Sequence, residues 1–143
     1  LKVFFGFYKC YFRWMKLEHI AIWVNDLELV KNFYVKYFKM ICSKKYINSE
    51  KRFTSYFLSF NETTTRIEIM HRPDIKSIQK KHHSSLGLTH FSISVGGKIK
   101  VDYLTEVLRK DGFKIAGEPR ITGDGYYESI VEDCEGNWVE ITE

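Results

Sequence analysis

The first clear pattern along the chain is an alternation of apolar and other residues in LEHIAIWV, residues 17–24. Isoleucine or valine occupies positions 20, 22 and 24, whereas His19, Ala21 and Trp23 occupy the positions between or before them. A period of two residues is that of a β-strand whose two faces meet different surroundings. We therefore predict a strand with one aliphatic face and one face that carries a histidine.

A helical pattern follows this strand. Asn25 or Asp26 can cap a helix that runs to about Lys39. The buried side of this helix would carry Val30, Phe33, Tyr34, Tyr37 and Phe38. Strand-like runs follow near 40–47, 52–60 and 65–71. The first part of the chain therefore predicts the order strand, helix and three strands.

The same order returns after residues 72–87, which contain Pro73 and the neighbouring His82 and His83. We interpret this stretch as a linker with solvated histidines. Next come a strand, a helix with Gly112 at its C-cap, and three strands, at 88–95, 98–111 and near 113–120, 126–132 and 137–142. A repeated order of elements predicts a duplicated fold. We expect one α+β domain, 15–143, made of two βαβββ modules, about 15–71 and 88–143.

Two histidines and two glutamates occupy matching places in these modules. His19 and His90 lie early in the first strands and are 90 − 19 = 71 residues apart. Glu68 and Glu140 lie centrally in the last strands and are 140 − 68 = 72 residues apart. The alternation places all four on the face opposite the aliphatic one. If the sheet curls with the helices outside, these side chains line a cup.

The four side chains have the chemistry of a metal-ligand set. A buried imidazole or carboxylate is costly unless it is matched. A divalent cation matches this set, because two carboxylates cancel its charge, and Ni, Zn, Co, Mn or Fe(II) accept such ligands. A six-coordinate ion would keep two positions for water or substrate. The pattern therefore predicts a catalytic metal site; the alternative is four unrelated polar residues on a solvated face.

At these residues the chain resembles the vicinal oxygen chelate superfamily, which includes glyoxalase I, bleomycin-resistance proteins and extradiol dioxygenases. The resemblance covers Met15 to Glu143 and rests on LEHIAIWVNDLELVKNFYVKYF, THFSISV and GDGYYESIVEDCEGNWVEIT. It is nearest to short bacterial lactoylglutathione lyase-like proteins. It implies two βαβββ modules that form a cupped mixed sheet with helices on the outer face, and it implies the same four residues as metal ligands.

The complete ligand set resembles that of glyoxalase I. By this resemblance the chain is a metal-dependent lyase or isomerase that acts on a small substrate with vicinal oxygens, through an enediolate stabilised by the ion. A released carboxylate would be the general base, with Glu140 as the first choice and Glu68 as the second. The alternatives are a fosfomycin-type thiol transferase, an extradiol dioxygenase, and a non-enzymatic protein that sequesters a small molecule such as a drug.

Two positions depart from the relatives that use glutathione. Those relatives tend to have an arginine where this chain has Trp23 and an asparagine where it has Arg72. Both positions would hold polar groups of the thiol, so glutathione is a doubtful co-substrate. Cys134 replaces a proline common in the turn before the last strand, which would alter the turn rather than the chemistry.

Other polar residues receive structural interpretations. His71 follows Met70 and should point away from the Glu68 side. The turn 123–125, Gly-Asp-Gly, would lie at the rim of the cup. Arg72 and Arg120 have the chemistry to hold an anionic group, but arginines near strand ends are most often solvated, and we interpret both in that way.

Composition limits the remaining function classes. The chain of 143 residues is 44% hydrophobic and carries a formal net charge of +4 without a basic stripe, so a globular domain is expected and nucleic-acid binding is not indicated. Its three cysteines form no C-x-x-C pair, which is typical of a reducing compartment. No apolar run reaches the roughly 20 residues of a membrane span. We expect a cytoplasmic protein that forms a homodimer through exposed sheet edges.

Residues 1–14, LKVFFGFYKCYFRW, form an aromatic extension in front of Met15. Cations and a glycine recur on one side of a helix at spacings of four, three and four residues, with aromatic residues on the other side. Such an extension can pack on the domain or on a second subunit. A helix that lies on a membrane surface and cloning-derived residues are the other interpretations.

Overall fold

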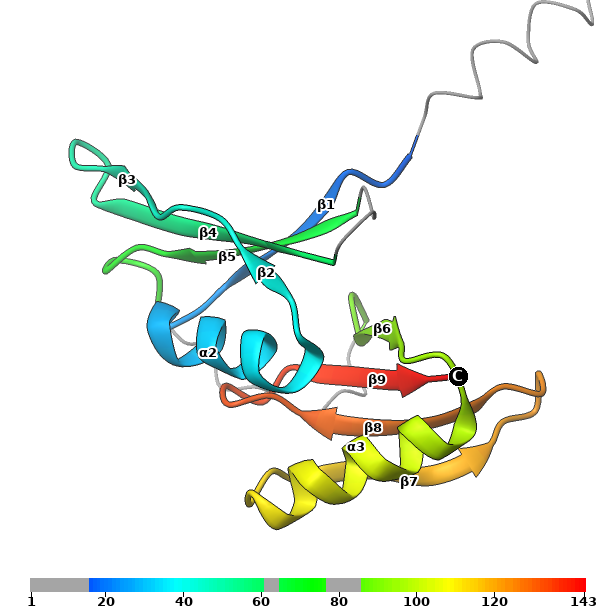
Figure 1. Ribbon diagram of the computed structural model, residues 1–143. Coiled ribbons are helices and arrows are strands. Elements are labelled where there is room, and N and C mark those ends of the chain that lie inside the picture. The colour runs from blue at the N-terminus through cyan, green and yellow to red at the C-terminus, as the bar shows by residue number, and fades with distance from the viewer. Residues whose placement is uncertain (1–15, 61–64, 77–85) are drawn as a thin grey trace, which may run out of the picture.

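The computed structural model describes residues 16–60, 65–76 and 86–143, so the extension 1–14 and both linker histidines lie outside the described residues. The described residues form two helices and nine strands (Figure 1). In chain order these are β1 (His19–Trp23), α2 (Leu27–Phe38), β2 (Ile41–Cys42), β3 (Tyr46–Asn48), β4 (Phe53–Ser59), β5 (Arg66–His71), β6 (His90–Ser94), α3 (Lys98–Lys110), β7 (Ile115–Ile121), β8 (Tyr127–Glu132) and β9 (Trp138–Thr142).

Each module forms its own sheet, and the two sheets share one topology. The strand order is β1-β5-β4-β2 in the first sheet, where β3 also pairs with β4, and β6-β9-β8-β7 in the second. The first strand of each module runs parallel to the last, and the other pairs are antiparallel. The connection between the parallel strands includes the helix, as a parallel crossover requires. Figure 1 shows the sheets as separate layers.

Each helix covers the aliphatic face of its own sheet: α2 contacts β4 and β5, and α3 contacts β7, β8 and β9. The side chain of Asp26 caps α2, because it accepts a hydrogen bond from the Leu29 amide at 2.9 Å. Gly112, with a φ of 87°, follows the last residues of α3. The buried core consists of Val24, Leu27, Val30, Phe33, Tyr34, Phe38, Met40, Leu58, Ile67, Ile69, Phe91, Ile93, Val101, Leu108, Val131, Val139 and Ile141.

The helix of the first module also joins the two modules. The buried Tyr34 hydroxyl of α2 donates a hydrogen bond to the Asp133 carboxylate, in the turn between β8 and β9, at 3.0 Å. In the same turn, the Glu135 carboxylate accepts hydrogen bonds from the amides of Asn25 and Asp26 at 2.6–2.8 Å. An acidic group at a helix N-terminus compensates the helix dipole. The start of α2 is therefore held by the second module.

The structure confirms the predicted α+β fold, and most strands differ by one or two residues from their predicted bounds. The run 40–47 differs more, because it contains two short strands, β2 and β3, instead of one. Between them, the Ser43 hydroxyl accepts the Phe57 amide at 3.0 Å, where a continuous strand would use a backbone carbonyl. Among the described residues, no helix has both the length and the apolar character needed to cross a membrane.

Candidate metal centre

His19 and Glu68 form the first pair of potential metal ligands. His19 opens β1, and Glu68 of the neighbouring β5 lies opposite Ala21, two residues beyond the histidine. Both side chains leave the sheet on the face away from α2, since the residues flanking Glu68, Ile67 and Ile69, are buried on the other face. The Nε2 atom of His19 lies 3.8 Å from Oε2 of Glu68.

Neighbouring side chains hold the imidazole of His19 in this orientation. Its Nδ1 lies within hydrogen-bonding reach of the Glu18 carboxylate, which also accepts a hydrogen bond from Arg66. The hydrogen bond with His19 is the largest cause that lowers the pKa of Glu18. The Phe57 ring meets the imidazole edge to face at 5.6 Å and lies 3.9 Å from the Arg66 guanidinium carbon. A carboxylate on one ring nitrogen directs the other nitrogen to a metal.

His90 and Glu140 form the second pair. His90 opens β6, and Glu140 of β9 lies opposite Ser92, again two residues beyond the histidine. The Nε2 atom of His90 lies 3.2 Å from Oε2 of Glu140. The side chains of this pair are 37% and 15% exposed, against 39% and 16% for the first pair. The two pairs therefore match in register, spacing and exposure.

The two pairs do not meet within one chain. Among the residues that the structure describes, no group of three or more His, Cys, Asp or Glu side chains has a metal-binding arrangement. Each pair lies on its own sheet, and the sheets occupy separate layers (Figure 1). A single chain thus presents two halves of the predicted four-ligand set.

A cavity of about 510 Å³ opens beside the second pair. It contains a second carboxylate that the sequence analysis did not single out, Glu128, which lies on the Glu140 face of β8 and is 9% exposed. Arg120 donates a hydrogen bond to Glu128 at 3.1 Å. Burial, followed by the charge of Glu140, raises the pKa of Glu128. The cavity is lined by His90, Ser92, Thr122, Asp124, Tyr126, Glu128, Glu140 and Thr142.

The signal that would have found Glu128 and Glu18 was present in the sequence. Glu128 alternates with the buried Ser129, and Glu18 directly precedes His19. The turn 123–125 contributes Asp124 to the cavity, as expected of a turn at the rim of a cup.

The arginines interpreted as solvated are instead paired. Arg120 binds Glu128, and the Arg72 guanidinium donates to both carboxylate oxygens of Asp74, at 2.6 and 2.9 Å. His71 points away from the Glu68 side, as predicted, and its Nδ1 lies 3.1 Å from the Val24 carbonyl oxygen. These residues are held by structural contacts.

The two described cysteines, Cys42 and Cys134, are free thiols. Burial raises the pKa of Cys134 to about 12, so this thiol stays protonated at neutral pH. Burial also raises the pKa of Cys42. Because the thiolate is the nucleophilic form, neither side chain is suited to covalent catalysis.

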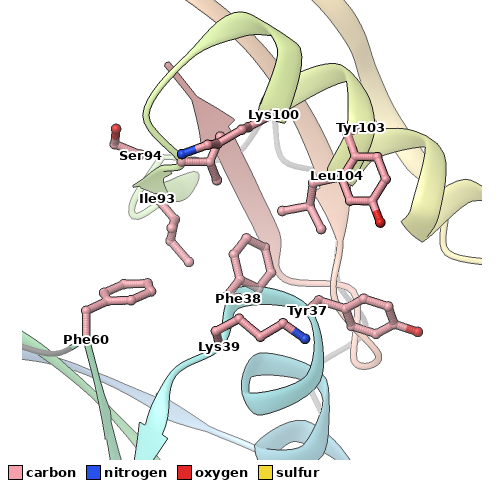
Figure 2. Close-up of a pocket in the computed structure, with 10 residues that line it drawn as sticks. Tyr37, Phe38, Lys39, Phe60, Ile93, Ser94, Lys100, Tyr103 and Leu104 are labelled. Atoms are coloured by element: carbon pink, nitrogen blue, oxygen red, sulfur yellow. The ribbon is translucent and has the colours of Figure 1, made fainter.

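A second cavity, of about 380 Å³, lies between the modules (Figure 2). The view shows the end of α2 below it and α3 above it, with Ile93 and Phe60 on the remaining side. Its described lining offers no carboxylate, imidazole or thiol, so it has no acid–base or metal-binding group. The lining consists of Tyr37, Phe38, Lys39, Phe60, Ile93, Ser94, Val95, Lys100, Tyr103 and Leu104.

The family of the chain follows from a match that spans both modules. The family model of the Glyoxalase/Bleomycin resistance protein/Dioxygenase superfamily matches residues 16–141. The chain belongs to this superfamily. Glyoxalase I and other members usually use a divalent metal, which agrees with the ligand types of the two pairs.

Superfamily members of known structure share the fold. The trypanothione-dependent glyoxalase I of Leishmania major is 25% identical, with a TM-score of 0.71 over 90% of this chain and 86% of that chain. The glyoxalase family protein of Enterococcus faecalis is 20% identical, with a TM-score of 0.72 over 92% and 99%. The uncharacterized protein YqjT of Bacillus subtilis (strain 168) is 26% identical over 128 residues, which are 87% of this chain and 96% of YqjT.

Proposed function

We propose that this superfamily member is a metal-dependent lyase or isomerase of the glyoxalase I type that acts on a small substrate with vicinal oxygens. The observation that carries the proposal is the repetition of one His–Glu pair, with equal register and exposure, on each sheet. Four unrelated polar residues would have no reason to repeat in this way. The ion would be Ni, Zn, Co, Mn or Fe.

The spacing within each pair suits a divalent ion. Imidazole nitrogens and carboxylate oxygens bind at about 2.1 Å, so two such ligands at right angles lie about 3 Å apart. Nε2 and Oε2 are 3.2 Å apart in the pair of His90 and Glu140, and 3.8 Å apart in the pair of His19 and Glu68. A small side-chain rotation brings the second distance to that value.

The complete site would be formed between two subunits. In this proposal, the His19–Glu68 pair of one subunit and the His90–Glu140 pair of another hold one ion, because the pairs are apart within a chain. Both pairs lie on sheet faces that the helices leave uncovered, and Trp23 on the first face is 42% exposed. Twofold symmetry would then produce two equivalent sites in a homodimer.

The bound ion would supply Lewis-acid stabilisation of the negative charge that develops on a substrate oxygen. The carboxylate of Glu140 would act as general base, taking the proton from one carbon and returning it to the adjacent carbon. The cavity of about 510 Å³ supports this role, because it gives a substrate access to Glu140. Glu68 is the second choice, since the bulky Phe57 lies opposite it in the ladder of β4 and β5.

The matched glutamates favour this proposal over the alternatives. Thiol transferases of the fosfomycin type and extradiol dioxygenases need one glutamate ligand, whereas here each glutamate has its own histidine within 4 Å. A protein that only sequesters a drug has no need of either pair. Both alternatives therefore leave part of the repeated arrangement unexplained.

Metal analysis of protein purified without chelator tests the proposal. We expect about one Ni or Zn ion per chain. We also expect the metal-loaded protein to exchange the carbon-bound proton of hydroxyacetone with D₂O, followed by NMR; protein treated with EDTA is the control and should recover exchange when metal is returned. A content under about 0.2 ions per chain, without uptake of added Ni or Zn, would overturn the proposal.

A further inference from the structure

Beyond Glu68, the first sheet carries apolar side chains on the same face as the candidate ligands. Trp23 and Met70 are opposite each other in the ladder of β1 and β5, one position pair beyond Glu68 on that face. Two residues of strand span about 7 Å, so this row lies within the reach of a small ligand held at Glu68. Ala21, directly opposite Glu68, leaves the way to Trp23 open because its side chain is a single methyl group.

Three aromatic side chains continue this row across the sheet, and we call Trp23, Phe53 and Tyr46 the aromatic shelf. The rings of Trp23 and Phe53 meet edge to face, with centroids 5.9 Å apart. The rings of Phe53 and Tyr46 are 6.0 Å apart, at 61°. Trp23 is 42% and Tyr46 54% exposed. The rings therefore fix one another and still present apolar surface outward.

The cations beside the shelf are neutralised. The Arg72 guanidinium lies 5.8 Å from the Trp23 ring, but Asp74 engages two of its nitrogens. Arg66, on the same face, is paired with Glu18. Both described arginines of this face thus already have a carboxylate partner, so an anionic ligand group would have to displace it.

We propose that the aromatic shelf binds the non-reacting substituent of the substrate, and that this substituent is a flat, uncharged aromatic group. The proposal rests on the proposed function, since the shelf lies beside one half of the candidate metal centre. An aryl ring on Trp23 removes apolar surface of both partners from water and gains ring contacts. A charged, peptide-like thiol would lose hydration without gaining a partner. The substrate class is therefore an aryl-substituted compound with vicinal oxygens.

Two hydroxamates measure the contribution of the shelf, because both bind a metal through neighbouring oxygens and differ only in a phenyl or a methyl group. Calorimetry on the Ni-loaded chain, corrected for binding to free Ni²⁺, gives their affinity ratio. We expect benzohydroxamate to bind about tenfold more tightly than acetohydroxamate, as partial burial of a phenyl ring provides. Trp23→Ala should reduce the ratio to about twofold and leave acetohydroxamate affinity unchanged, whereas Trp23→Phe should keep most of it.

Ile47→Ala is the matched control. Ile47 is 62% exposed and neighbours Tyr46 in β3, but alternation places it on the opposite face. This variant should leave the ratio of the two hydroxamates unchanged.

Each other outcome overturns the proposal. Equal affinities in the unmodified chain, or an unchanged ratio in Trp23→Ala, would remove the shelf and leave the metal centre standing. A Trp23→Ala variant that changes the mass measured by light scattering, but not the ratio, would show a subunit contact instead. Displacement of benzohydroxamate by an equal concentration of S-methylglutathione would show that the subsite accepts charge. If the chain takes up no metal and binds neither hydroxamate, the proposed function fails, and the shelf falls with it.

Discussion

The two modules carry the same His–Glu pair on sheets of the same topology, but the row beyond the glutamate differs between them. In the first module this row contains Trp23 and Met70, and in the second the corresponding positions are Ser94 and Thr142. The second module adds the buried Glu128 opposite Thr142. One candidate ligand pair therefore borders an apolar surface, and the other borders a polar cavity.

This difference separates what the duplication has kept from what it has not. The register, distance and exposure of the pair are nearly equal in both modules. The rows next to the pair have diverged in polarity. In the proposed homodimer, both surfaces would flank one ion, so the substrate would meet an apolar wall from one subunit and a polar wall from the other.

The largest predicted effect breaks the equality of the two glutamates. Glu140→Gln should slow proton exchange into hydroxyacetone by about a hundredfold or more, because it removes the general base. Glu68→Gln should slow exchange less, since the base remains. Circular dichroism should show both variants folded. A larger loss in Glu68→Gln would transfer the role of base to the first module.

The next effect concerns the helices, because α2 reaches the other module. Tyr34→Phe removes the buried hydroxyl that donates to Asp133. We expect the free energy of unfolding to fall by about 2 kcal/mol, as for a hydrogen bond to a charged group. Urea denaturation measures this change; a loss of less than about 0.5 kcal/mol would mean that this contact does not hold the modules together.

A smaller effect should distinguish the two histidines. Glu18 contacts Nδ1 of His19, whereas the residue before His90 is Thr89, which has no carboxylate. Glu18→Gln should weaken Ni binding about tenfold in calorimetry, because a charged partner raises the donor strength of the imidazole. Thr89→Val serves as the matched variant and should change it by less than about twofold. Equal losses would contradict the difference between the half-sites.

The smallest effect lies within the second module. The Thr105 hydroxyl of α3 donates to the Val101 carbonyl or to Ser129, each at 2.7 Å, in a buried site. Thr105→Val should lower the free energy of unfolding by about 1 kcal/mol, as for a neutral hydrogen bond. A cost in urea denaturation as large as that of Tyr34→Phe would remove the contrast between a contact within a module and a contact between modules.

Much of the fold was predictable because its signals are local. The two-residue alternation around His19 and Glu68 gives the faces of their strands, and Asp26 followed by apolar positions at helical spacing marks the start of α2. The nearly equal His-to-Glu separations predicted the equal register of the two pairs. These features depend on neighbours in sequence or in one ladder.

The relation between the two pairs was not predictable in the same way. It depends on how the sheets are oriented, which long-range contacts such as the hydrogen bond from Tyr34 to Asp133 determine. Ser43 likewise interrupts the predicted strand 40–47 through a contact with Phe57, a residue 14 positions away. Neither contact leaves a periodic signal in the sequence.

The central claim, that one site combines the first pair of one subunit with the second pair of another, has a direct test by complementation. His19→Ala and His90→Ala chains, each inactive alone in the exchange assay, are co-expressed with different tags and purified for both. A doubly tagged dimer has one intact site of two if sites are shared, so we predict about half of the unmodified exchange rate. If each site lay within a single chain, both chains would carry a broken site, and no recovery in the mixed dimer would contradict the account.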